Sequence, residues 1–403
     1  MMQSMKSLAL LSSLAIFLLC DKTNGFQLNL PTNARVPVAH NNGMVIAPIQ
    51  SKQISNHINK KTKSKSLTVT TLKSEAVASN ESNKKEVPFP IVLWRFTRPH
   101  TLIGSALAIP ALHIFAAPTF KDAFTVTTAI SAIFAMIPSL LMNLYITGLN
   151  QITDVEIDKV NKPNLPIAAG DLSLNTAIKV VVFSLILSVA LSLSNPILGT
   201  QGLNVALWGS MILGTMYSLP PFRLKRFPFL AAFCIVAVRG TIINAGFYAH
   251  AKAAAYSATG MSATVLGCMS DQRCFLSSLF FALFGIVIAL MKDVPDAVGD
   301  ALFNIRSFTV RIGQKTVFKT MRRVLTALFL GVGGGFARLA TQTSSMNLTL
   351  CRTLVSISAI AAGVSVRNEA KDVDAEDSGM VYEYYMHLWK LFYLSYLVLP
   401  FAR

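Results

Sequence analysis

The sequence predicts an all-α, polytopic membrane protein with about nine transmembrane helices. The 403 residues are 53% hydrophobic and 14% charged, with a mean hydropathy of +0.52, which is too apolar for an ordinary soluble domain. From about residue 100 onward, apolar runs alternate with short polar breaks. Many of these runs approach the roughly 20 residues that a membrane helix needs.

The charge and the cysteines exclude several other classes of protein. The net charge is +17, but much of the excess lies in the N-terminal tail and in loops beside apolar runs. In a membrane protein such charges orient the chain and bind anions, so we predict membrane lipid and no nucleic acid as a partner. The five cysteines form no CxxC pair and predict neither a zinc site nor a disulfide framework.

The N-terminus resembles targeting sequence. Residues 1–25 contain the apolar run "SLALLSSLAIFLLC" and are typical of a secretory signal peptide. Residues 26–88 are rich in Ser, Thr, Asn and Lys, which is transit-peptide composition and predicts a disordered basic segment. Together they resemble the bipartite presequence of a complex plastid, so we predict a plastid membrane. The alternative is an N-terminal anchor with a disordered linker. Residues 89–403 then form the membrane domain.

Nine apolar segments follow. Glycine and proline inside them are compatible with membrane helices, where neighbouring helices satisfy the backbone. The expected spans are 101–118, 124–147, 175–194, 198–218, 228–250, 274–292, 318–340, 351–367 and 384–401.

The order of the spans brings three charged loops to one side of the membrane. The loops after the second, fourth and sixth spans must share a side, and they hold most of the charged residues near the membrane. The opposite side is nearly bare. Because Lys and Arg bias sets orientation, we expect the charged side to face the cytosol-equivalent compartment, which is the stroma in a plastid.

Two of these loops carry acidic clusters with helical spacing. Asn150, Asp154 and Asp158 are four residues apart, so on a helix that continues from the second span they form one stripe. Asp293, Asp296 and Asp300 also share one helix face. Two carboxylate stripes repel unless a cation lies between them, and oxygen ligands suit Mg²⁺, which commonly joins carboxylates to phosphates.

The third loop is basic, so its residues either set the orientation of the chain in the membrane or bind phosphate. "FRLKR" (222–226) lies on the same predicted side as both acidic clusters. Arginine and lysine bind phosphate oxygens through charge-assisted hydrogen bonds. These features predict a site for a diphosphate attached to a lipid tail. The candidate diphosphate ligands are Arg223, Lys225, Arg226 and Lys292.

These motifs resemble those of one family, the UbiA-type intramembrane prenyltransferases. "NQITDVEID" (150–158) and "KDVPDAVGD" (292–300) look like its two aspartate-rich motifs. Five further segments resemble the homogentisate prenyltransferase branch of this family. They are "LWRFTRPHTLIG" (93–104), "NKPNLPIAAGDLS" (161–173), "YSLPPFRLKRFP" (217–228), "IRSFTVRIGQKTVF" (305–318) and "LWKLFYLSYLVLP" (388–400). The resemblance implies a UbiA-like fold, with the helices around a central pocket.

The resemblance also implies a mechanism. Asn150, Asp154 and Asp158 would hold one Mg²⁺, and Asp293, Asp296 and Asp300 a second, with Asp154, Asp158, Asp293 and Asp296 as the catalytic carboxylates. The metals, together with Lys225 and Arg223, would neutralise the diphosphate as it leaves a prenyl diphosphate. The ring of homogentisate would attack the allylic cation, with loss of its carboxylate, in tocopherol or plastoquinone biosynthesis.

Other functions compete with this one. The phytyl donor is slightly favoured over solanesyl, and a chlorophyll synthase or another quinone prenyltransferase is an alternative. The branch often has an acidic residue at the position of Val298 and a basic one near Ala301, which implies an altered second cluster. Outside the enzyme class, the alternatives are a transporter and a non-catalytic protein that binds prenyl lipid. A transporter usually places ionisable residues near the bilayer midplane, rather than at one edge.

Arg239 is a candidate for binding the acceptor, together with Arg98 and Asn244. It lies about 11 residues into the fifth span, or about 16 Å deep at 1.5 Å per residue. That is near the middle of the hydrocarbon core, where an arginine requires a polar cavity or an anion. We expect Arg239 to face a cavity, supported by Asn244, and to pair with the acceptor carboxylate or a buried Asp. The alternative is a structural arginine bonded to backbone carbonyls.

Overall fold

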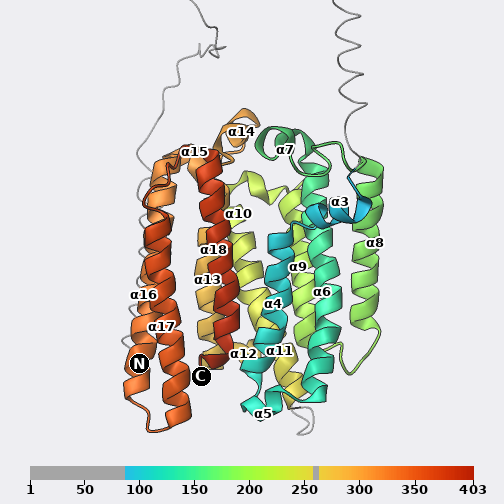
Figure 1. Cartoon of the computed structure of the whole chain (residues 1–403). Helices are drawn as coiled ribbons and strands as arrows, with labels where there is room; N and C mark the ends of the chain where they lie inside the picture. The colour runs from blue at the N-terminus through green and yellow to red at the C-terminus, as the bar shows by residue number, and fades with distance from the viewer. Residues whose placement is uncertain (1–86, 257–262) are drawn as a thin grey trace, which may run out of the picture. The chain divides into compact units, whose positions relative to one another are not determined.

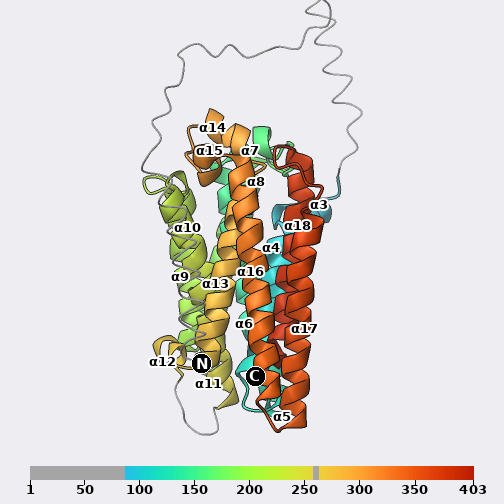
Figure 2. The same ribbon diagram turned by 90° about the vertical axis from the view of Figure 1, so that its left-hand side faces the viewer.

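The computed structural model describes residues 87–256 and 263–403, which are helical and contain no strand. The predicted targeting segments lie outside the described residues, except for the last two residues of 26–88. The all-α class that the sequence predicts is confirmed. Figures 1 and 2 show long helices that run side by side, with short helices at their ends.

The long helices match the expected spans closely. They are α4 (Pro99–Ala116), α6 (Val126–Thr153), α8 (Leu174–Leu193), α9 (Gln201–Ser218), α13 (Gln272–Lys292), α16 (Gln314–Thr341), α17 (Met346–Glu369) and α18 (Ser378–Val398). A further long helix joins α10 (Pro228–Val236), η2 (Ala237–Ile242) and α11 (Ile243–Ala255). The short helices are α3 (Phe89–Phe96), α5 (Phe120–Ala123), α7 (Val155–Asn161), η1 (Leu224–Arg226), α12 (Val265–Met269), α14 (Ala297–Leu302), α15 (Phe308–Ile312) and η4 (Leu399–Phe401).

Seven helices in the described part of the chain are long and apolar enough to cross a membrane. They are α4, α6, α8, the α10–α11 helix, α13, α16 and α17. The helices α9 and α18 are not among them, so the predicted number of nine spans is not confirmed. Large apolar side chains on the outer helices are exposed, as expected of surfaces that face lipid tails. Examples are Ile130, Ile137, Val182, Phe183 and Ile186.

Polar side chains fix where the helices begin. The side chains of Thr125, Ser173 and Thr200 each accept a hydrogen bond from a backbone N–H in the first turn of α6, α8 and α9. Pro138 lies inside α6, as the sequence predicts for a membrane helix. The Ser188 hydroxyl of α8 donates to the carbonyl oxygen of Pro138 at 2.7 Å, which ties α8 to α6 at this position.

Aromatic side chains pack α13 against α18. Phe281 stacks on Tyr396 with ring centroids 4.0 Å apart, and Phe392 contacts both rings edge-on. All three side chains are buried. This contact holds the C-terminal helix against the centre of the bundle, and it places Trp389 of α18 beside the cavity described below.

The fifth span is not a regular α-helix. Its middle, η2, is π-helical, a rare form that is frequent at functional sites. Here Gly240 lies against α13, and a Cβ atom added to it would come within 2.3 Å of the Cβ of Ala282. Only glycine permits this close approach of the two helices. Arg239 lies in the same turn, so the irregular segment also sets the position of this side chain.

The charged loops gather at one end of the bundle, as the order of the spans predicts. Figure 1 shows α7, α14 and α15 at one end, whereas α5 and α12 lie at the other. The basic loop lies at the same end as α7, α14 and α15, because Lys225 lines the same pocket as Asp154 and Asp293.

Cysteine labelling tests this arrangement in a membrane. Ser173 begins α8 and Gln314 begins α16 at the charged end, whereas Ser270 precedes α13 at the opposite end. In closed vesicles of one orientation, an impermeant thiol reagent should label Ser173→Cys and Gln314→Cys from the same side, and Ser270→Cys only after permeabilisation or from the other side. Cys351 is partly exposed and is replaced by Ala in all variants. Labelling of all three positions from one side would contradict the topology.

Candidate active site

A polar pocket lies at the charged end of the bundle. Its volume is about 70 Å³, and it is lined by side chains from both halves of the chain. Five carboxylates and four cationic groups face it. The carboxylates are Asp154, Asp158, Asp293, Asp296 and Asp300, and the cations are Arg98, Lys162, Lys225 and Lys292.

The first acidic cluster lies where α6 ends. The expectation of one continuous helix is wrong, because α6 stops at Thr153 and α7 starts after a break at Asp154 (φ −119°, ψ 16°). The break coincides with contacts to another segment, since the Asp154 carboxylate binds cations of the basic loop. Asn150, Asp154 and Asp158 nevertheless line the same pocket. The Asn150 amide donates to Asp154 at 3.0 Å.

The basic loop is tied to this first cluster. Lys225 Nζ and Arg223 Nη2 both form ion pairs with the Asp154 carboxylate, the latter at 3.1 Å. Burial lowers the pKa of Lys225. Arg223 has a φ of 38°, a left-handed conformation that a non-glycine residue rarely adopts outside functional or strained sites. Arg226, by contrast, is exposed and does not line the pocket.

The second acidic cluster lies where α13 ends. Asp293 follows the last turn of α13, and Asp296 precedes α14. Lys162, at the end of α7, forms an ion pair with Asp296, and the Asn161 amide donates to Asp300 at 3.5 Å. The two acidic motifs are therefore joined, although more than 130 residues separate Lys162 from Asp296 along the chain.

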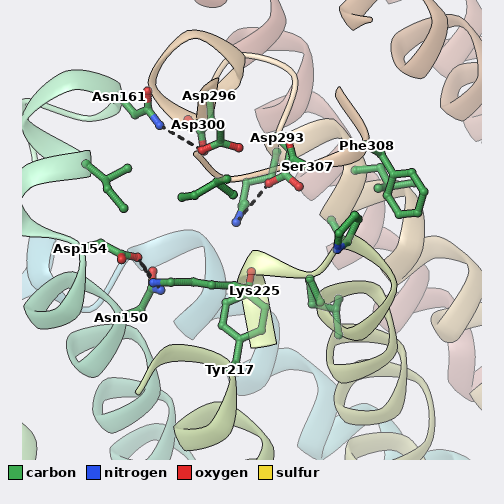
Figure 3. Close-up of a pocket in the computed structure, with 18 of the residues that line it drawn as sticks. Asn150, Asp154, Asn161, Tyr217, Lys225, Asp293, Asp296, Asp300, Ser307 and Phe308 are labelled. Carbon is green, nitrogen blue, oxygen red and sulfur yellow. Dashed lines mark hydrogen bonds and ion pairs between the residues drawn. The ribbon is translucent and has the colours of Figure 1, made fainter. Parts of the chain in front are cut away.

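Figure 3 shows Asp154 and Asn150 across the pocket from Asp293, Asp296 and Asp300, with Lys225 and Tyr217 between the flanking helices. Sequence reasoning missed Asn161, Lys162 and Tyr217 as site residues. Lys162 had a usable signal, since it follows Asp158 by four residues and so lies on the same side of a helical turn.

The buried carboxylates carry shifted pKa values. Burial raises the pKa of Asp158 to about 6 and that of Asp300 to about 7, because desolvation penalises the charged form. Burial also raises the pKa of Asp293. Ionised carboxylates in this pocket therefore require positive charge nearby.

The pocket has the donor chemistry of a magnesium site. Its candidate ligands are carboxylate and amide oxygens, which Mg²⁺ prefers. Within residues 87–256 and 263–403, no group of three His, Cys, Asp or Glu side chains is arranged to hold a metal ion. Asp154 and Asp296 are instead turned towards lysine partners. The donor set fits the ion, and in this structure two of the carboxylates pair with lysines.

A second cavity adjoins the polar pocket. Its volume is about 230 Å³, and it extends between the helices α4, α6, α9, the α10–α11 helix, α13 and α18. Most of its wall is apolar, with polar groups at a few places. Six residues line both cavities, so the charged end of the bundle opens onto this space. They are Arg98, Asn150, Tyr217, Ile235, Ala289 and Lys292.

The structure places Arg98 and Arg239 at this second cavity. Arg98 precedes α4 in a left-handed conformation (φ 52°) and lines both cavities. The sequence suggested that Asn244 would support the Arg239 guanidinium, but Asn244 forms no hydrogen bond with this group. Its amide donates to the Arg239 carbonyl oxygen and accepts a hydrogen bond from the Tyr396 hydroxyl at 3.1 Å, so it supports the π-helical backbone.

The two departures from the family pattern lie outside the pocket. Val298 is 66% exposed, Ala301 is exposed, and neither lines the polar pocket. Asp293, Asp296 and Asp300 all line it. The residues at these two positions therefore do not remove any carboxylate of the second cluster from the pocket in this structure.

The sequence matches a known protein family and several curated proteins. The model of the UbiA prenyltransferase family matches residues 105–391. Homogentisate phytyltransferase 1, chloroplastic, from Arabidopsis thaliana is 38% identical over 82% of this chain and 79% of its own length. Homogentisate phytyltransferase from Synechocystis sp. is 36% identical over 77% of this chain and 94% of its own length.

A search of solved structures also found a match. It is the structure of a UbiA homolog from Archaeoglobus fulgidus bound to GPP and Mg²⁺, with 15% sequence identity and a TM-score of 0.48. The similarity covers 77% of this chain and 99% of that one.

Proposed function

The chain belongs to the UbiA prenyltransferase family, and from that premise we propose that it prenylates homogentisate, a step in tocopherol or plastoquinone biosynthesis. The relatives that carry homogentisate in their names span most of this chain. The observation that carries the proposal is that two acidic clusters and three lysines line one pocket, which opens onto a largely apolar cavity.

The reaction exchanges one bond for another. The bond between the first prenyl carbon and the diphosphate oxygen breaks, and a carbon of the homogentisate ring bonds to that prenyl carbon. The ring proton leaves, and the acetate side chain loses CO₂ and takes up a proton. The barrier lies in separating an anionic diphosphate from an allylic cation, so the protein must stabilise the leaving group and exclude water.

Lys225 and Lys292 are the side chains best placed to bind the diphosphate. Both line the polar pocket, and Lys292 also lines the adjoining cavity, where the two substrates would meet. Lys225 is held by Asp154, and its side chain is only 8% exposed. Because little water screens the ammonium group there, its charge would interact strongly with a phosphate oxygen. Arg223 would act through Asp154, which it holds in position.

Asn150, Asp154 and Asp158 on one side, with Asp293, Asp296 and Asp300 on the other, would hold Mg²⁺. When bound, Mg²⁺ supplies Lewis-acid stabilisation of the charge that develops on the leaving diphosphate. Lys225 and Lys162 line the same pocket as these carboxylates and would add positive charge for the phosphate oxygens.

The site also implies a place in the cell. We propose a plastid membrane with the charged end towards the stroma, because Lys and Arg collect in the loops of that end. The bipartite presequence of residues 1–88 would deliver the chain to a complex plastid.

A donor panel tests the proposed function. Membranes from a host that lacks this activity, with and without the protein, are given homogentisate or chlorophyllide as the acceptor, and phytyl, geranylgeranyl or solanesyl diphosphate as the donor. We expect a prenylated, decarboxylated quinol with at least one donor, and phytyl diphosphate to give the highest kcat/KM. Absence of product with every donor would refute the function. Product from chlorophyllide but not from homogentisate would favour a chlorophyll synthase instead.

A further inference from the structure

Arg239 is a charged side chain in the middle of the bundle without an anionic partner. It lies in η2 and lines the second cavity. Within the described residues, no carboxylate forms an ion pair with its guanidinium, and no hydrogen bond joins that group to a backbone carbonyl. Its backbone carbonyl oxygen, by contrast, accepts a hydrogen bond from the side-chain amide of Asn244. The expected buried Asp is therefore absent from these residues, as are the carbonyl contacts of a structural arginine.

Aromatic groups surround this arginine at the cavity wall. The Arg239 guanidinium carbon lies 4.9 Å from the ring centroid of Trp389. The His100 ring stands edge-on to the same tryptophan at 5.2 Å, and Tyr385 lies beside both. These side chains come from η2, α4 and α18, and all of them line the cavity.

Two polar atoms in this group have no partner. Neither the buried Trp389 Nε1 nor the buried His100 Nε2 forms a hydrogen bond in the described part of the chain. Trp389 itself is 1% exposed. Buried polar atoms are nearly always hydrogen-bonded, so two unpaired atoms beside a cavity and an unpaired cation point to a ligand that completes them.

The chemistry of the wall defines this ligand. An unpaired guanidinium and an indole N–H bind a carboxylate, because both donate and arginine carries a permanent charge. The rings of Trp389, Tyr385 and His100 favour an aromatic body. His100 Nε2 can form a hydrogen bond with a ring hydroxyl. Lys292 lies at the boundary with the polar pocket, so a ligand in this cavity would lie next to the diphosphate. The wall therefore suits a hydroxylated aromatic acid.

We propose that Arg239, with Trp389 and His100, forms the subsite for the carboxylate-bearing aromatic acceptor. Arg239 thus selects acidic acceptors over neutral quinols of the same size. This inference rests on the proposed function for the identity of the acceptor, and it adds the residues that recognise it. The prenyl diphosphate is bound elsewhere, by the polar pocket.

Direct binding separates this role from a structural one. The purified full-length protein in detergent is titrated by calorimetry with homogentisate and, separately, with methylhydroquinone, which lacks the carboxylate. In Arg239→Gln we expect the Kd for homogentisate to rise by about 10- to 100-fold, the range of a lost charge-assisted hydrogen bond. The weak binding of methylhydroquinone and the KM for the prenyl diphosphate should change by less than about twofold. Arg239→Lys should restore part of the affinity, since it keeps the charge but loses the fork.

Arg352 provides a matched control. It is another arginine in a long helix, but its guanidinium donates to the carbonyl oxygens of Leu339 at 2.9 Å and Arg403 at 3.2 Å, and it lines neither cavity. Arg352→Gln should leave the binding of both ligands unchanged, and thermal unfolding checks that each variant is folded. Equal losses for homogentisate and methylhydroquinone, or for homogentisate and the prenyl diphosphate, would overturn the proposal.

The outcomes also separate the subsite from the proposed function. If the wild type binds homogentisate through Arg239 but turns over no donor, the subsite stands and the proposed function fails. If turnover is normal and the Kd for homogentisate is the same in Arg239→Gln, the proposed function stands and the subsite is refuted.

Discussion

Replacing Asp154 or Asp296 with asparagine is expected to lower kcat by about 100- to 1,000-fold, the size of effect seen when one preorganised stabilising group is removed from an active site. Each substitution keeps the size and polarity of the side chain but removes one negative charge from the polar pocket. Asp154 lies in the first acidic cluster and Asp296 in the second, so each variant tests one cluster. Single-turnover rates in detergent or in membranes provide the measurement.

Glu156 is the matched control for these variants. It belongs to the same acidic segment, but its side chain is 71% exposed and pairs with Lys159 at 2.7 Å, outside the pocket. Glu156→Gln should change kcat by less than about twofold, since exposed pairs of this kind contribute little. Comparable rates for Asp154→Asn, Asp296→Asn and Glu156→Gln, all correctly folded, would show that the two clusters take no part in the reaction.

Replacing Lys225 with methionine should mainly weaken the binding of the prenyl diphosphate. Methionine keeps the apolar stem but removes a charge that lies inside the pocket, with its side chain 8% exposed. We expect KM for the prenyl diphosphate to rise by about 10- to 100-fold, because a buried charge-assisted hydrogen bond to phosphate is lost. The KM for homogentisate should stay within about twofold. Initial rates over a matrix of both substrate concentrations give the two values.

Arg226→Met is the control for the basic loop. Arg226 is the neighbouring cation, but it is exposed and does not line the pocket. Its replacement should leave both KM values unchanged. If Arg226→Met raised the KM for the prenyl diphosphate as much as Lys225→Met did, the effect would come from the net charge of the membrane surface, and the role of Lys225 as a direct ligand would be rejected.

The helices and the gathering of the charged loops could be predicted from the sequence because both follow from local properties. A run such as 274–292 is apolar enough to identify a membrane helix by itself, and the structure gives α13 at Gln272–Lys292. The order of the spans then fixes which loops share an end. The family motifs in those loops could be recognised for the same reason, since each lies within a few consecutive residues.

The number of spans was less predictable. The helices α9 and α18 occupy the expected segments, yet neither is apolar enough to count among the seven candidate spans. Helix α18 carries several tyrosines, whose hydroxyls lower its hydropathy, although Tyr384, Tyr385 and Tyr396 are buried in the bundle. A helix that packs against protein need not be as apolar as one that faces lipid.

The details of the site depend on contacts between distant segments, which one sequence does not contain. The break at Asp154 accompanies ion pairs to Lys225 and Arg223, about 70 residues away. The pairing of Lys162 with Asp296 joins the two acidic motifs. The π-helical turn at Arg239 accompanies the close approach of Gly240 to α13. In each case tertiary packing overrides the local pattern.

Both acidic clusters and Mg²⁺ are expected to bind one prenyl diphosphate together. The most direct measurement is the affinity of the protein for an unreactive prenyl thiolodiphosphate as Mg²⁺ is titrated into EDTA-treated protein. We expect no tight binding in EDTA, recovery with Mg²⁺, and a Mg²⁺ midpoint that rises at least about tenfold in Asp154→Asn and in Asp296→Asn but not in Glu156→Gln. Tight binding that persists in EDTA, or one midpoint shared by all four proteins, would contradict it.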